Sequence, residues 1–343
     1  MINVDTCKVS LPLKKKFVVS KGEAEVKTNL LTILNNRYSG EAAGSVYYGP
    51  SVETMQSEIL KGIKLLKKSA KITTQTLDEI NQYDIVPAAR SALMGMVLNY
   101  LSGESQRYPW EILEIPKPVG IISSYTVSIA DPAEMIKAIN ESPFPIIKVK
   151  MGNEEDVQLV DAFKAIKGKE IRVDANGGWS PAKAEEMIYF LARNGIRIIE
   201  QPTDVAHAKD WPHLKAKNTE VELILDEGLN TVKDFEEYFS SVDGVNIKME
   251  KCGGIIEGIE IAARAEEENK KVMLGCMVES SVGIAQSVYM SALADYCDLD
   301  GPQLLENDIA SGIMYQKELI EVDREIIGGP KLKRELVDKY IQP

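Results

Sequence analysis

The sequence predicts an α/β protein built on a (β/α)8 TIM barrel, with a smaller α+β domain in front of it. Three observations support this expectation. The chain is 343 residues long, short β-branched runs alternate with helical stretches from about residue 120 onward, and eight such runs are present. A barrel of roughly 200 residues leaves enough chain for a second domain. Strands that alternate with helical segments are typical of parallel sheets.

The eight predicted strands are short, and helical patterns lie between them. They cover residues 123–129, 145–150, 171–175, 196–200, 221–226, 244–248, 271–275 and 297–300. Several of the helical patterns begin on an N-cap residue or on a proline in the first turn, which marks the start of a helix. Eight strand–helix units favour a closed barrel, although the repeat count alone also fits an open, doubly wound sheet.

The rest of the chain predicts the domain organisation. Residues 1–118 combine alternating strand patterns, a glycine-rich loop and helical patterns, as expected for an α+β domain. We expect residues 119–314 to form the barrel. Residues 315–343 return to short strand patterns, and we expect them to rejoin the first domain.

Composition and charge exclude several classes of protein. Hydrophobic residues make up 44% and charged residues 27% of the chain, as in an ordinary folded protein. The net charge of −12 disfavours binding to nucleic acid. We find no pattern of a membrane span or of a signal peptide. The four cysteines lack paired spacing, which fits a reducing cytoplasm rather than a disulfide framework or a zinc site.

Three acidic residues end successive predicted strands and lie 26 positions apart: Asp174, Glu200 and Asp226. Steps of one βα unit place such side chains side by side on the C-terminal rim of a barrel, where barrel enzymes have their active sites. Carboxylates without His or Cys suit a hard cation, and Mg²⁺ fits best. A single acid at a strand end more often caps a helix or forms an ion pair. Polar residues expected to surround the ligands follow them: Asn176, Gln201 and Glu227.

Lysines flank this acidic triad on both sides in the sequence. Lys148 and Lys150 point to one face of their strand, and Lys248 ends a later strand. Close cations and partial burial would lower the pKa of such a lysine towards that of a base, although a single lysine at a strand end is as often a solvated charge. A metal with an amine on each side suits removal of a proton α to a carboxylate and its return on the other face, because the metal stabilises the enediolate.

Taken in order, the motifs KVK, VDAN, IEQP, DEG and NIKMEKCGG resemble those of the enolase superfamily, in its muconate-lactonizing subgroup. The resemblance covers nearly the whole chain. It implies an α+β capping domain before the barrel, completed by the C-terminal tail. It also implies one Mg²⁺ per subunit, held by Asp174, Glu200 and Asp226.

The same resemblance implies roles for the lysines. Lys150 and Lys248 correspond to the opposed acid/base pair, and Lys148 to an electrostatic aid near the enediolate. Lys251, in the same NIKMEK stretch, is an alternative to Lys248. We favour Lys248 because it follows the strand directly, whereas Lys251 belongs to the following loop.

The last predicted strand carries Asp298 and Asp300, and the period of two puts both on one face, where they could hold an ammonium group. A helix-capping role is an alternative. This DLD motif resembles that of the dipeptide epimerases, which binds the free amino terminus of a dipeptide whose C-terminal residue is inverted. The resemblance therefore implies an isomerase with a small dipeptide as its partner. Family members often form homo-oligomers.

Further substrate contacts are implied by the same resemblance. Cys276 and Met277 are expected to contact the dipeptide through main-chain groups, with ordinary packing as the alternative. Thr126 on the first barrel strand is a further candidate. Lys21, in a capping-domain loop, would meet an acidic side chain, as in an L-Ala-D/L-Glu epimerase of cell-wall peptides, whereas Glu23 would favour a cationic one.

Three other functions compete with this interpretation. N-acylamino acid racemases, o-succinylbenzoate synthases and cycloisomerases use the same lysine–metal–lysine core, but the DLD motif argues against them. An acid-sugar dehydratase would need a catalytic histidine on a late strand, and both histidines of this chain, His207 and His213, lie in one earlier segment. A non-catalytic barrel is the third alternative.

Overall fold

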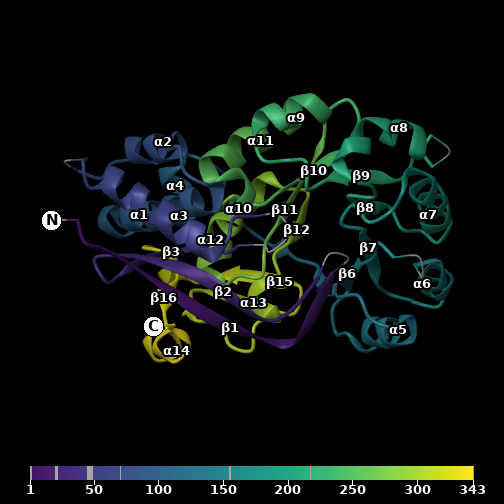
Figure 1. Ribbon diagram of the computed structural model, residues 1–343, viewed down its shortest axis with the longest axis horizontal. Helices are drawn as coiled ribbons and strands as arrows, with labels where there is room; N and C mark the ends of the chain where they lie inside the picture. The colour runs from purple at the N-terminus through teal and green to yellow at the C-terminus, as the bar shows by residue number, and fades with distance from the viewer. Residues whose placement is uncertain are drawn as a thin grey trace.

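The computed structural model describes residues 2–19, 22–44, 49–69, 71–153, 156–216 and 218–342. It begins with an antiparallel sheet of order β1-β2-β3, formed by β1 (Val4–Val19), β2 (Gly22–Leu34) and β3 (Tyr38–Ala42). The register of β1 and β2 shifts between Pro12 and Phe17. A proline has no N–H to donate to a neighbouring strand, which fits this irregularity. The two strands form a long ribbon that reaches towards the barrel (Figure 1).

Four helices follow this sheet: α1 (Val52–Leu66), α2 (Gln75–Asn81), α3 (Pro87–Ser105) and α4 (Pro109–Ile112). Helices α1 and α3 pack on the sheet, and α2 and α4 pack on α3. The central helix, α3, is buried on most sides and packs directly on β3. A Cβ atom on Gly40 of β3 would lie 1.9 Å from the carbonyl oxygen of Ala92 in α3. Glycine at position 40 therefore allows the helix and the sheet to approach this closely.

The eight predicted barrel strands are all present, within a residue or two of their expected bounds. They are β5 (Tyr125–Val127), β6 (Ile146–Lys150), β7 (Glu170–Asp174), β8 (Ile198–Glu200), β9 (Glu222–Leu225), β10 (Gly244–Ile247), β11 (Lys271–Gly275) and β12 (Tyr296–Asp298). Every strand pairs in parallel with its neighbours in the sequence. A parallel bridge between Ser123 and Cys297 joins the first strand region to the last. The closed barrel is therefore confirmed, and the open sheet is excluded.

Helices between the strands surround the barrel (Figure 1). They are α5 (Pro132–Glu141), α6 (Asp156–Phe163), α7 (Pro181–Arg193), α8 (Trp211–Leu214), α9 (Val232–Tyr238), α11 (Ile255–Glu267) and α12 (Ser281–Tyr289). Two short helices follow strands directly, α10 (Met249–Cys252) after β10 and α13 (Gly301–Leu304) after β12. Side chains of Asp131, Ser180, Thr231 and Ser280 cap the first turns of α5, α7, α9 and α12. No helix among the described residues is long and apolar enough to cross a membrane.

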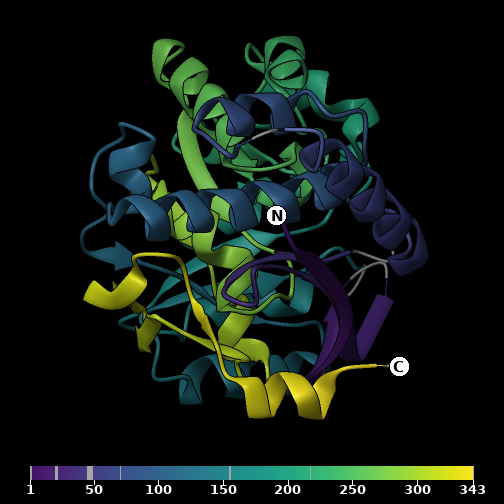
Figure 2. The same ribbon diagram turned by 90° about the vertical axis from the view of Figure 1, so that its left-hand side faces the viewer.

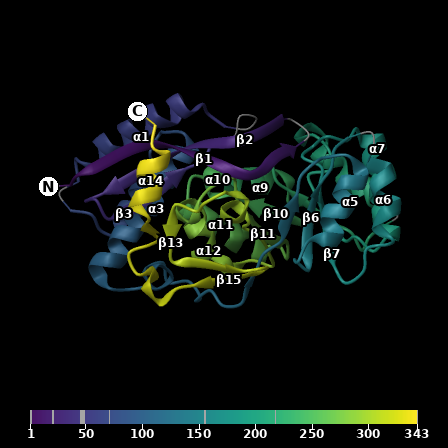
Figure 3. The ribbon, with the colours of Figure 1, turned by 90° about the horizontal axis from the view of Figure 1, so that it is seen from below.

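The C-terminal part of the chain forms short strands and a last helix that contacts β1. Strands β14 (Ile313–Gln316) and β15 (Leu319–Val322) form a sheet with β4 (Ile121–Ile122), and β13 (Ala310–Ser311) pairs with β16 (Lys331–Leu332). The last helix, α14 (Arg334–Tyr340), then runs beside the β1 ribbon (Figures 2 and 3). The amide of Gln342 donates to the carbonyl of Lys8 at 2.9 Å. The end of the chain therefore packs on β1 of the N-terminal sheet, and the predicted domain boundaries stay a prediction.

Candidate active site

The three acidic residues of the triad meet at the C-terminal rim of the barrel. Asp174 and Glu200 are the last residues of β7 and β8, where they pair in register, and Asp226 follows β9. One carboxylate oxygen from each residue lies within 4.8 Å of the other two. Their exposed fractions are 0%, 1% and 2%. The sequence spacing therefore predicted this cluster correctly.

The groups around the triad fit a cation. Burial and the charge of Asp174 raise the pKa of Glu200 to about 8, so the nearby lysines do not fully offset the crowding of the carboxylates. Nearby, Asn176 Oδ1 and Glu227 Oε2 are buried and accept no hydrogen bond from the described residues. Hard oxygen atoms that are buried and without donors are the ligands that Mg²⁺ prefers. The triad can therefore hold a metal ion.

Other hydrogen bonds fix the triad in place. Gln201 accepts the amide N–H groups of Asp226 and Glu227 on its Oε1, at 2.9 and 3.0 Å. Asn246 Nδ2 donates to Glu200 Oε1 at 2.8 Å. Our sequence reasoning placed Gln201 beside the ligands but missed Asn246. The available signal was its position two residues before Lys248, which puts both side chains on one face of β10.

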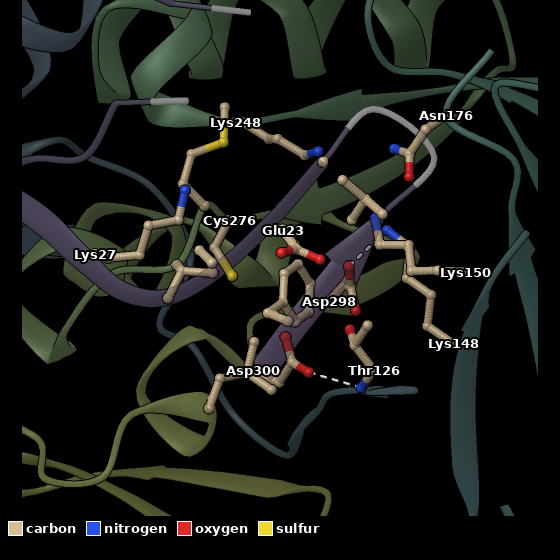
Figure 4. Close-up of a pocket in the computed structure, with 17 residues that line it drawn as sticks. Glu23, Lys27, Thr126, Lys148, Lys150, Asn176, Lys248, Cys276, Asp298 and Asp300 are labelled. Atoms are coloured by element: carbon tan, nitrogen blue, oxygen red, sulfur yellow. Dashed lines mark hydrogen bonds and ion pairs between the residues drawn. The ribbon is translucent and has the colours of Figure 1, made fainter. Parts of the chain in front are cut away.

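Three lysine ammonium groups lie against the triad. In the pocket, the ammonium groups of Lys148 and Lys150 lie close together, and that of Lys248 lies apart from them (Figure 4). Lys150 Nζ lies 2.6 Å from Asp174 Oδ2, and Lys248 Nζ lies 2.6 Å from Asp226 Oδ2. Lys148 Nζ lies 2.7 Å from Glu200 Oε2. Carboxylates with an amine on either flank are the arrangement that the sequence predicted.

The direction of the lysine pKa shifts differs from our expectation. Burial lowers the pKa of Lys148 and of Lys248, but the surrounding carboxylates more than offset it and hold both pKa values above the usual range. The sequence showed the lysines close to one another, but it did not show how near each ammonium lies to an acidic oxygen. A buried lysine becomes a weaker acid when carboxylates outnumber cations around it.

The geometry distinguishes Lys248 from Lys251. Lys251, in α10, donates to Asp226 Oδ1 at 2.5 Å and also to the main-chain carbonyl of Asp226. Lys248 lines the pocket above the triad, whereas Lys251 does not. Lys251 thus holds Asp226 in place, and Lys248 is the one of the two lysines that borders the pocket.

Asp298 and Asp300 lie in the same pocket, but their surroundings differ. Asp298 Oδ2 lies 2.7 Å from Lys148 Nζ, and Asp298 Oδ1 accepts the hydroxyl of Ser124 at 2.6 Å. Asp300 Oδ2 accepts the amide N–H of Thr126 at 2.7 Å and forms no ion pair with a described residue. Burial and the charge of Asp298 raise the pKa of Asp300 to about 7. Asp300 is therefore the aspartate of the DLD motif that is available to a ligand ammonium.

Other predicted contacts also line the pocket. Thr126, Cys276 and Met277 all border it. The amide N–H of Met277 already donates to Glu279 Oε1 at 2.9 Å, and a main-chain contact of Met277 with a substrate stays a prediction. Glu23 lines the pocket as well, while Lys21 lies outside the described residues.

A buried carboxylate that sequence reasoning missed joins the two domains behind the pocket wall. Glu41 of β3 accepts the amide N–H groups of Ser280 and Gly283, at 3.2 and 3.1 Å, and so lies at the N-terminus of α12. Negative charge is favourable at a helix N-terminus. In return, Glu250 of α10 accepts the amide N–H of Ala43 at 3.0 Å. These bonds fix the N-terminal sheet against the loop that carries Cys276 and Met277.

Comparisons with known proteins agree with this geometry. Residues 131–320 match the family model of the enolase C-terminal domain-like proteins. A hydrophobic dipeptide epimerase of Roseobacter litoralis is 33% identical, with 89% of this chain and 92% of that protein aligned. An L-Ala-D/L-amino acid epimerase of Maribacter sp. is 31% identical, again with 89% of this chain and 92% of that protein aligned.

A solved structure shows the same fold. The dipeptide epimerase from Cytophaga hutchinsonii, complexed with Mg and the dipeptide D-Ala-L-Val, superposes with a TM-score of 0.88 at 23% identity and covers 99% of this chain and 97% of that one. The chain therefore belongs to the enolase C-terminal domain-like family, as an isomerase related to the dipeptide epimerases.

Proposed function

We propose that this protein is a Mg²⁺-dependent dipeptide epimerase that inverts the α-carbon of the C-terminal residue of a dipeptide. The observation that carries the proposal is the placement of Lys150 and Lys248 on opposite flanks of the acidic triad, with Asp300 in the same pocket. Both relatives named above are epimerases, and one is named for dipeptides.

In this proposal the triad holds the metal. Asp174, Glu200 and Asp226 supply the carboxylate ligands, and the bound Mg²⁺ would supply positive charge for the carboxylate end of the substrate. Lys148 adds a further positive charge beside it, because its ammonium lies against Glu200. Both charges favour the enediolate over the substrate, since negative charge builds up on these oxygens when the α-proton leaves.

The lysines on the two flanks carry the proton. The neutral amine of one lysine, Lys150 for one epimer, accepts the α-proton, and the electron pair of the broken C–H bond moves into the enediolate. The ammonium of Lys248 then donates a proton to the other face of the same carbon. The reverse reaction uses the same two groups in exchanged roles, so one site interconverts the two epimers.

The DLD motif supports a dipeptide over other substrates of the subgroup. A dipeptide has a free ammonium, and Asp300 is a buried carboxylate without a cationic partner among the described residues. N-acylamino acids, succinylbenzoate precursors and muconates have no ammonium to place there. An acidic dipeptide such as L-Ala-D/L-Glu is our preferred substrate. The cytoplasmic location, a homo-oligomeric state and a role with cell-wall peptides stay predictions.

A library experiment tests this proposal. Dipeptides and N-acylamino acids are incubated separately with the protein and Mg²⁺ in D2O, and incorporation of deuterium is followed by mass spectrometry. We expect dipeptides to gain deuterium at the C-terminal α-carbon and N-acylamino acids to remain unlabelled. Labelling confined to N-acylamino acids would instead identify a racemase of the same subgroup.

A further inference from the structure

Most of the charged side chains that line the pocket are already neutralised. Lys150 and Lys248 pair with the acidic triad, and Lys148 pairs with Asp298. Glu23 pairs with Lys16 at 2.7 Å, and both side chains are largely exposed. Within the described part of the chain, two lining charges have no oppositely charged partner, Asp300 and Lys27. The pocket thus presents one unpaired anion and one unpaired cation.

Lys27 faces the pocket because of its place on β2. Two residues further along the strand, Asn29 donates to the carbonyl of Val278 at 3.1 Å. Side chains two residues apart on a strand point the same way, so Lys27 also faces the loop of Cys276 and Met277. Figure 4 shows its ammonium on the side of the pocket where Lys248 and Cys276 lie, apart from Asp300.

The surroundings of Lys27 favour an anionic ligand. Its side chain is partly buried, and burial lowers its pKa with no carboxylate nearby to offset the effect. Glu23 does not compensate, since it lies at the exposed end of the ribbon with Lys16. A partly desolvated ammonium gains most from a carboxylate that binds against it.

The other groups of a dipeptide are accounted for elsewhere. In the proposed function, its α-carboxylate lies at the triad beside Lys148, and its ammonium lies at Asp300. The part of the substrate left to meet β2 is the side chain of the C-terminal residue, whose α-carbon lies beside Lys248. Lys27 comes from β2 and lies on the Lys248 side of the pocket.

We propose that Lys27 is a specificity residue that binds a side-chain carboxylate on the C-terminal residue, so that the pocket selects dipeptides ending in Glu or Asp. This proposal rests on the proposed function. The proposed preference differs from that of relatives named for hydrophobic dipeptides. Lys27 would be the residue that causes the preference for acidic dipeptides.

The test compares two dipeptides that differ in one side-chain group, L-Ala-L-Glu and L-Ala-L-Gln. We expect wild-type protein to favour the Glu dipeptide in kcat/KM by roughly 10- to 100-fold, the usual range for a hydrogen bond to a charged group. Lys27→Gln should remove this preference through a higher KM for the Glu dipeptide. The kcat/KM for the Gln dipeptide should change much less than that for the Glu dipeptide, and an unchanged midpoint of thermal unfolding shows that the variant is folded.

Two further variants sharpen the test. Lys27→Glu should reverse the preference, favouring L-Ala-L-Lys over L-Ala-L-Glu. Lys15→Gln, a matched control that removes an exposed lysine of the same ribbon, should keep the wild-type preference, because Lys15 does not line the pocket.

The outcomes distinguish the two proposals. If wild-type protein epimerises both dipeptides and Lys27→Gln keeps the same Glu/Gln ratio, the role of Lys27 is overturned while the epimerase function stands. The role of Lys27 is also overturned if its substitution changes only the preference for an acidic N-terminal residue, as measured with L-Glu-L-Ala and L-Gln-L-Ala. If wild-type protein epimerises no dipeptide at all, the proposed function fails and the role of Lys27 fails with it.

Discussion

The ammonium of Lys148 lies 2.7 Å from Asp298 Oδ2, and this ion pair joins the acidic triad to the DLD motif. Both side chains are buried. Because Asp298 is committed to Lys148 and Asp300 is not, the two aspartates should have different effects on catalysis.

Substitution of each aspartate by asparagine tests this difference. Asp300→Asn should raise KM for dipeptides by about tenfold or more with a smaller effect on kcat, because it removes a charge that binds substrate. Asp298→Asn should lower kcat by about tenfold or more, because it removes a partner of Lys148. Steady-state kinetics measures both constants. Equal increases in KM with unchanged kcat in the two variants would contradict the division.

Gly275, the last residue of β11, leaves room for Lys248. A Cβ at this position would lie 2.8 Å from Lys248 Cε and 2.5 Å from Asn246 Oδ1. Gly275→Ala should therefore displace an acid/base group and loosen Glu200, which Asn246 holds. We expect kcat to fall by roughly 10- to 100-fold, since small displacements of reacting groups have effects of this size. The midpoint of thermal unfolding should also fall, because the added methyl group overpacks a buried site. A wild-type kcat would show that the site tolerates the methyl group.

Metal binding should be visible as stabilisation. A ligand that binds only the folded protein adds about 2.7 kcal/mol when it is present at about 100 times its Kd. We expect Mg²⁺ to raise the midpoint of thermal unfolding and EDTA to reverse the effect, with activity following the same course. Asp226→Asn should abolish the Mg²⁺-dependent shift, because it removes one of three clustered carboxylates. A shift of wild-type size in that variant would place the metal elsewhere.

Glu279 should make stability depend on pH. Burial and the charge of Glu41 raise the pKa of Glu279 from 4.5 to about 8 in the folded protein. When folding raises the pKa of a carboxyl, the folded protein binds a proton more tightly than the unfolded chain does. The contribution of Glu279 to the free energy of unfolding therefore falls as pH rises from about 4.5 to about 8, and it is constant above that. Glu279→Gln cannot ionise and keeps an oxygen that accepts the N–H of Met277.

The difference in thermal midpoint, variant minus wild type, should therefore increase between about pH 4.5 and pH 8 and then level off. Thermal unfolding followed by circular dichroism over this range measures it. A difference that stays constant, or that decreases with rising pH, would show that Glu279 is ionised throughout.

The sequence predicted the barrel and the acidic triad because both depend on a regular step. One βα unit separates Asp174, Glu200 and Asp226, and parallel strands in register bring such positions together. The lysines of β6 followed from strand alternation alone. The repeat count favoured a closed barrel, and the bridge between Ser123 and Cys297 excluded the open sheet.

Contacts between segments that lie far apart in the chain could not be predicted from the sequence. Glu41 and Ser280 lie 239 positions apart and meet only because the N-terminal sheet packs on the loop after β11. The ion pair between Lys148 and Asp298 forms only when the barrel closes. It gives Asp298 and Asp300 different surroundings, which the alternation of side chains along a strand could not reveal. The raised pKa of Lys148 has the same origin, because the number of carboxylates around a buried lysine is a property of the folded site.

The most direct measurement of the central claim follows epimerisation of L-Ala-L-Glu in D2O with Mg²⁺, by NMR of the α-proton, for wild-type protein and for Lys150→Ala and Lys248→Ala. With one amine on each flank of the triad, wild-type protein should form the other epimer with deuterium at the C-terminal α-carbon. Each variant should form it more slowly by roughly 10²- to 10⁴-fold, the usual contribution of a general acid or base. Epimerisation at the wild-type rate in either variant would contradict the two-lysine mechanism.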